Sequence, residues 1–122
     1  MPTIVHFDLT ADDTDRAKAF YGELFGWKFQ KYPGPVDYYL IETTDLTGAP
    51  GVGGGLGKRD APGQGVTNYV GVDSLDEYAA RVEKLGGRVV QPKMEVPGFG
   101  WMVVCMDPDN NPLGLWQEMP PT

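Results

Sequence analysis

The stretch Asp12–Trp27 reads DDTDRAKAFYGELFGW and decides the fold that we predict. Acidic and hydroxyl residues open it, as a helix N-terminus favours, and Gly26 follows its last apolar residue, as a left-handed helix end requires. Between these two signals the apolar residues recur at helical spacing. They are Ala17, Phe20, Tyr21, Leu24 and Phe25. The stretch therefore predicts an amphipathic helix with one apolar stripe facing a core.

The same order of features returns 61 residues later, which is half the length of the 122-residue chain. Asp73–Arg88 reads DSLDEYAARVEKLGGR, in which Ser74 and Glu77 fit a capping box. The second apolar stripe comprises Leu75, Tyr78, Ala79, Val82 and Leu85, and two glycines follow it. Similarity at a fixed offset indicates that the chain contains two copies of one structural unit.

One predicted strand precedes each helix and three follow it. The strands cover residues 3–10, 27–32, 38–43 and 51–56 in the first copy, and 66–72, 88–90, 101–106 and 113–117 in the second. The sequence therefore predicts an α+β chain built from two βαβββ modules in tandem.

These modules are predicted to form a single domain, with module 1 at about 1–58, a linker at about 58–64 and module 2 at about 65–119. Polar residues at 45–50 and 107–111 are typical of the turns between the last two strands of each module. The glycines at 53–55 leave a strand without side chains, which favours close approach of a backbone, another subunit or a ligand.

Composition and charge exclude several classes of protein. Hydrophobic residues make up 41% of the chain and charged residues 22%, as in an ordinary globular domain. The formal net charge of −7 argues against a nucleic acid or an anionic membrane as partner. The sequence shows no signal peptide and no apolar stretch that would span a bilayer, so we expect a cytoplasmic protein. Cys105 is the single cysteine, which we expect to be a buried, inert thiol.

The chain resembles the vicinal oxygen chelate superfamily, which includes glyoxalase I, bleomycin-resistance proteins, fosfomycin-resistance proteins and extradiol dioxygenases. The resemblance rests on the opening strand with His6, the helix end FYGELFGW at 20–27 and the turn DPDNN at 107–111. It implies that the two modules form a cup-shaped half-barrel (the glyoxalase/bleomycin resistance fold) with the ligand site inside. It also implies a homodimer.

In the metalloenzymes of this family, His or Glu side chains from the first and last strands of the modules hold a divalent ion. His6 matches one such position, but Thr67 stands at the equivalent position of the second module, and Gly114 replaces the last-strand glutamate. Catalytic sites use about three protein ligands. We therefore expect no resident cofactor, with a divalent metal as the alternative. Asp8, Glu42 and Glu118 are the acidic residues that could replace the missing ligands.

The resemblance favours a protein of the bleomycin-resistance type, in which binding of a small organic molecule suffices. The predicted ligand-binding residues are His6, Tyr39, Thr67, Trp101 and Trp116. His6 is also the candidate catalytic residue, as a general base, although a hydrogen-bonded structural histidine explains it too. Core packing is the alternative for the aromatic residues.

Two other functions remain open from the sequence. One is a metal-dependent glyoxalase-like lyase or isomerase, or an extradiol-type dioxygenase, that uses His6 with further ligands. The other is an accessory domain that only dimerises or binds a protein.

Overall fold

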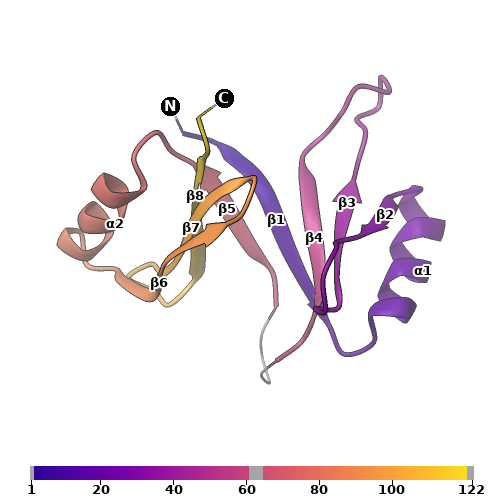
Figure 1. Ribbon diagram of the computed structural model, residues 1–122, viewed down its shortest axis with the longest axis horizontal. Helices are drawn as coiled ribbons and strands as arrows, with labels where there is room; N and C mark the ends of the chain where they lie inside the picture. Colours follow the sequence, from indigo (N-terminus) through magenta and orange to yellow (C-terminus); the bar gives the residue numbers. More distant parts are fainter. Residues whose placement is uncertain (1, 61–64, 121–122) are drawn as a thin grey trace. The chain divides into compact units, whose positions relative to one another are not determined.

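The computed structural model describes residues 2–60 and 65–120, which form two βαβββ series (Figure 1). The first series is β1 (Ile4–Ala11), α1 (Thr14–Phe25), β2 (Lys28–Lys31), β3 (Tyr38–Glu42) and β4 (Gly53–Lys58). The second is β5 (Thr67–Gly71), α2 (Leu75–Lys84), β6 (Arg88–Val96), β7 (Gly100–Met106) and β8 (Pro112–Glu118). This order confirms the α+β class and the repeated βαβββ module.

The chain divides into two compact units, which we call the first unit (His6–Val66) and the second unit (Met1–Val5 with Thr67–Thr122). The start of β1 belongs to the second unit, where the Gly71 amide donates a hydrogen bond to the Thr3 carbonyl at 3.0 Å. Residues 61–64 of the predicted linker lie outside the described residues. Lys58 is the last residue of β4, so the strand extends to the start of that linker.

Each unit has an open sheet with one parallel pair of strands. In the first unit β4 pairs with β1 in parallel and with β3 antiparallel, and β2 lies outside β3. In the second unit β8 pairs with β5 in parallel and with β7 antiparallel, and β6 lies outside β7. Figure 1 shows each helix lying against the sheet of its own unit.

Strand alternation gives each sheet a face toward its helix and a face away from it. In the first unit Phe7 faces the helix side, where its ring centroid lies 5.6 Å from that of Trp27. In the second unit Leu75, Val103, Cys105 and Leu115 form a buried core cluster beneath α2. The faces away from the helices carry the candidate site.

The helix ends follow the predicted signals. Asp13 caps α1 by accepting a hydrogen bond from the Arg16 amide at 3.0 Å, and Gly26 ends the helix with φ of 72°. Ser74 caps α2 by accepting from the Glu77 amide at 3.3 Å, and Gly86, just after that helix, has φ of 99°. Both glycines adopt the left-handed conformation, which glycine reaches without steric cost because it has no Cβ atom.

The prediction that both apolar stripes face a core is wrong at several positions. Phe20, Leu24 and Phe25 of α1 are each 58% exposed. Tyr21 and Trp27 stack between the helix and the sheet, with ring centroids 5.2 Å apart. The three exposed residues lie at the edge of this contact between helix and sheet. In the second stripe Leu85 is 71% exposed because α2 ends one residue earlier.

Cys105 is fully buried, as predicted, and burial raises the pKa of its thiol. Since the thiolate is the reactive form, this environment makes Cys105 an unreactive core residue. Within the described part of the chain, neither helix has the length and apolar character needed to cross a membrane.

Candidate functional site

A strip without side chains runs along the face of the first sheet that points away from α1. It consists of Gly53, Gly55 and Gly57 of β4. Gly55 pairs with Asp8 of β1 on one side and with Leu40 of β3 on the other. Two residues further along β4, Gly57 pairs with Tyr38 of β3. Side chains of β1 and β3 therefore face each other across glycine.

Tyr38 crosses this strip and joins a three-residue hydrogen-bonded cluster. Its hydroxyl donates to the Asp8 Oδ1 at 2.7 Å and lies 3.4 Å from the His6 Nε2. The same His6 nitrogen lies 2.9 Å from the Asp8 Oδ1. The side chains of His6 and Asp8 are 32% and 28% exposed, so the cluster remains accessible from solvent. We call His6, Asp8 and Tyr38 the polar cluster.

The glycines of β4 make room for side chains of this same chain. A Cβ atom at Gly55 would overlap the Tyr38 hydroxyl, and one at Gly54 would lie 2.6 Å from the Phe7 ring. The sequence predicts close approach of a backbone, another subunit or a ligand to this strand. The groups that approach it here are instead side chains of the same chain, Tyr38 on one face and Phe7 on the other.

The polar cluster can anchor a ligand or move a proton. An ionised Asp8 only accepts hydrogen bonds, so it receives them from Tyr38 and from a protonated His6 Nε2. In the neutral imidazole this assignment makes the Nδ1 atom of His6 the acceptor. A histidine oriented by a carboxylate is a typical general base, and it is also a well-defined polar anchor.

The structure places Tyr39 away from His6. Tyr39 lies on the helix side of β3, where the Lys18 Nζ is 3.9 Å from the centroid of its ring. Its neighbour Tyr38, which is not among the predicted ligand-binding residues, is the tyrosine of the polar cluster. Both residues were placed on a strand, but alternation alone does not tell which of two adjacent tyrosines faces a given side.

In the second unit, Thr67 and Trp116 lie on the face away from α2, whereas Trp101 lies on the opposite face. Trp101 packs against the buried core beneath α2. Tyr69 shares the face of Trp116 and pairs with Gly114, as Asp8 pairs with Gly55 in the first unit. The structure therefore brings Thr67 and Trp116 to one face and separates Trp101 from them.

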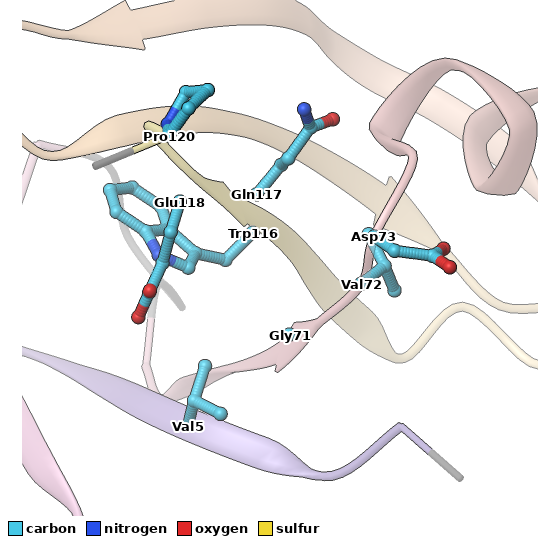
Figure 2. Close-up of a pocket in the computed structure, with 8 residues that line it drawn as sticks. All are labelled: Val5, Gly71, Val72, Asp73, Trp116, Gln117, Glu118 and Pro120. Atoms are coloured by element: carbon cyan, nitrogen blue, oxygen red, sulfur yellow. The ribbon is translucent and has the colours of Figure 1, made fainter. Parts of the chain in front are cut away.

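A cavity of about 500 Å³ opens in the second unit beside Trp116 (Figure 2). Its lining includes Val5, Gly71, Trp116 and Glu118. Figure 2 shows Trp116 and Glu118 projecting from β8 toward the Val5 side of the cavity, whereas Gln117 projects away from it. The Gln117 Oε1 accepts a hydrogen bond from the Leu75 amide at 2.8 Å, which accounts for that direction.

Neither last strand carries a carboxylate at the place where the resemblance implies a metal ligand. Gly55 and Gly114 occupy equivalent places on the last strands of the two modules, and a tyrosine side chain covers each. A Cβ atom at Gly114 would overlap the ring of Tyr69, just as one at Gly55 would overlap Tyr38. A metal-binding carboxylate at either place would need the space that the tyrosine fills.

The three acidic residues that could replace the missing ligands lie in different surroundings. Asp8 already accepts two hydrogen bonds in the polar cluster. Glu42 is exposed on β3, and Glu118 lines the cavity of the second unit. Among residues 2–60 and 65–120, no three His, Cys, Asp or Glu side chains are grouped so that they could hold a metal ion.

The sequence is similar to a known protein family and to several known proteins. Residues 3–44 match the family described as bleomycin resistance protein-like N-terminal. The proteins named "Putative glyoxylase CFP32" in Mycobacterium bovis and Mycobacterium tuberculosis are 31% identical over 90% of this chain and 43% of their own length. The anthracycline biosynthesis protein DnrV of Streptomyces peucetius is 29% identical over 92% of this chain and 46% of its own length. A glyoxylase-like domain-containing protein of Didymella fabae is 32% identical over 75% of this chain and 77% of its own length.

A solved structure shares the fold. The crystal structure of a glyoxalase/bleomycin resistance protein/dioxygenase superfamily member from Vibrio splendidus aligns with a TM-score of 0.68 and 18% identity, over 97% of this chain and 100% of that chain. The chain spans less than half the length of the mycobacterial and Streptomyces relatives.

Proposed function

Since this chain belongs to the vicinal oxygen chelate superfamily, we propose that it binds a small organic molecule without a resident metal ion. The binding surfaces are the sheet faces that point away from the helices. Each unit offers a surface of its own: the first has the hydrogen-bonding groups of the polar cluster, and the second has the apolar lining of the cavity beside Trp116. A few polar groups among apolar walls are typical of small-molecule sites.

One observation carries this proposal. Tyr38 covers Gly55 and Tyr69 covers Gly114, so a tyrosine takes the space of the last-strand carboxylate in both modules. Loss of one ligand would still allow a weakened metal site. Filling of both positions by bulky side chains supports a site that works through contact with an organic ligand. The name of the Streptomyces relative, which refers to anthracycline biosynthesis, is in keeping with a flat, ring-containing ligand.

Elemental analysis tests the proposal directly. The protein is purified without a histidine tag and without chelator, and then incubated with Zn²⁺, Mn²⁺, Ni²⁺ and Fe²⁺. We expect far less than one metal ion per chain, and no change in melting temperature on addition of EDTA. About one ion per chain, removed by EDTA with a fall in melting temperature, would contradict the proposal, because a catalytic ion binds through about three protein ligands.

The polar cluster favours a second candidate function, a glyoxalase-like lyase or isomerase in which His6 is the general base. The observation behind it is the 2.9 Å contact between His6 and Asp8, which orients the imidazole. Turnover of a carbonyl substrate that His6→Ala abolishes, with an unchanged melting temperature, would establish this function. Equal activity of the His6→Ala variant would exclude His6 as its catalyst.

A further inference from the structure

The cavity of the second unit lies where two parallel strands end. Gly71 is the last residue of β5 and pairs with Trp116 near the end of β8, so the carboxyl ends of both strands meet at this edge. Val5, at the start of β1, closes a further side. The cavity therefore rests on paired strands, which hold its lining side chains in place.

Two glycines fix the shape of this cavity. A Cβ atom at Gly71 would lie 3.1 Å from a methyl carbon of Val5, so any side chain there would press into the lining. A Cβ atom at Gly100 of β7 would lie 2.9 Å from the Cζ2 atom of Trp116. The edge of the indole therefore lies close to Gly100, where a larger residue would meet both Trp116 and the Gln117 backbone.

The charge of the lining has one sign. Glu118 and Asp73 are its ionisable residues, and both are exposed. Among the described residues that line the cavity, none is Lys, Arg or His. The whole chain carries a net charge of −7, which adds to the negative potential at this edge. An anionic ligand would meet repulsion from Glu118 and Asp73 with no compensating cation.

We propose that this cavity binds a small organic cation, whose positive group lies between the indole face of Trp116 and the carboxylate of Glu118. This inference rests on the proposed function and names the chemical class of its ligand. The face of an indole attracts cations through its quadrupole, and Trp is the strongest of the aromatic side chains in this respect. Val5 supplies apolar contact for the hydrocarbon part of the ligand.

Two ligands that have the same shape but differ in charge test the inference. Choline and 3,3-dimethylbutan-1-ol differ in the replacement of the ammonium nitrogen by carbon. In calorimetric titrations of the full chain, we expect choline to bind about tenfold more tightly than the alcohol, in line with a desolvated cation–π contact plus an ion pair. We also expect added salt to weaken choline binding and to leave alcohol binding unchanged. Choline binding that is absent, or no tighter than alcohol binding, overturns the inference.

Substitutions at Glu118 and Trp116 test whether choline binds in this cavity. Glu118→Gln is expected to weaken choline binding several-fold and to leave alcohol binding unchanged. The matched control is Glu23→Gln, which makes the same charge change at an exposed residue of α1 in the other unit. Equal effects of the two variants would show that net charge alone acts, and would overturn the site. Trp116→Phe retains an aromatic ring and is expected to keep part of the choline preference, whereas Trp116→Leu is expected to lose it.

This experiment separates the two proposals. Stoichiometric metal in the purified protein contradicts the proposed function, whatever choline does. Absence of a preference for choline in a metal-free protein that still binds neutral ring-containing molecules overturns only the inference about cations.

Discussion

At the scale of single residues, the polar cluster depends on the absence of a Cβ atom at Gly55. Tyr38 reaches Asp8 because residue 55 has no side chain, and the cluster positions His6 through Asp8. The second unit repeats this device with Tyr69 over Gly114. A glycine covered by a tyrosine side chain is therefore a local feature of both sheet faces.

Substitution of Gly55 by Ala is expected to destabilise the fold. The added methyl group would overlap the Tyr38 hydroxyl, and overpacking of this kind costs about 1–3 kcal/mol of unfolding free energy. Urea denaturation followed by circular dichroism measures the change. A matched control is Gly65→Ala, since a Cβ atom there would meet no atom of the described residues within 4 Å, and its effect should be close to zero.

The explanation through Tyr38 has its own test. In the double variant Gly55→Ala with Tyr38→Ala, the overlap with Tyr38 is absent, although the added methyl group still lies 2.6 Å from the Asp8 Oδ1. The two substitutions should therefore cost less together than the sum of their separate effects. Strict additivity would show that Tyr38 is not the source of the Gly55→Ala penalty.

At the scale of elements, the turns that join the last two strands of each module use the same chemistry. Asp45 accepts hydrogen bonds from the amides of Thr47 and Ala49 at 2.8 and 3.0 Å. Asp107 accepts from the amides of Asp109 and Asn111 at 2.8 and 2.9 Å. The Thr47 hydroxyl, together with the backbone amides, lowers the pKa of Asp45. The amide and side chain of Asn111 do the same for the pKa of Asp107.

The lowered pKa of Asp107 predicts a pH-dependent contribution to stability. A carboxyl whose pKa is lower in the folded state stabilises the fold above its unfolded pKa, which is near 3.8, and this contribution is lost as the pH falls through the folded pKa. We expect Asp107→Ala to be less stable than the natural chain at about pH 7, with a smaller difference at about pH 3. Thermal denaturation at both pH values measures it.

Two results would count against this role of the turn. One is a difference between the natural chain and Asp107→Ala that stays the same at both pH values. The other is an Asp107→Asn variant with the full pH dependence of the natural chain, since an amide keeps an acceptor oxygen but does not titrate in this range.

At the scale of the whole molecule, the core of the second unit holds a built-in probe of unfolding. Cys105 is fully buried, and burial raises the pKa of its thiol. We expect a thiol reagent at about pH 8 to label Cys105 only as fast as the second unit opens, and to label it rapidly and completely in denaturing urea. Cys105→Ser serves as the blank. Rapid stoichiometric labelling of the folded protein would contradict the burial of this thiol.

Much of the fold follows from signals that are local in the sequence. Gly26 and Ser74 mark helix ends because each satisfies a requirement of its own backbone position, and both act in the structure as predicted. The 61-residue repeat gave the module order, since it compares the chain only with itself. The cup-shaped half-barrel and the homodimer stay predictions.

The candidate site was predictable only in part. His6 and Trp116 lie on the faces away from the helices, but Tyr39 and Trp101, which were also predicted to bind the ligand, lie on the helix sides. Tyr38 was not among the predicted ligand-binding residues. The exposure of the apolar stripe of α1 was not predictable for a similar reason. Helical spacing shows which residues share one side of a helix, but not how much of that side another element covers.

Signals within the sequence thus specify the class of fold, the two modules, their caps and their turns. Replacement of a last-strand carboxylate by Gly114 stays a prediction from the family resemblance. The tertiary structure alone decided which side of each strand faces the helix and what fills the space above each glycine. The physical reason is that side chains alternate along a strand with a period of two, so a shift of one residue exchanges the faces. Only the pairing of β3, β4 and β1 fixes that register and brings Tyr38 to Asp8.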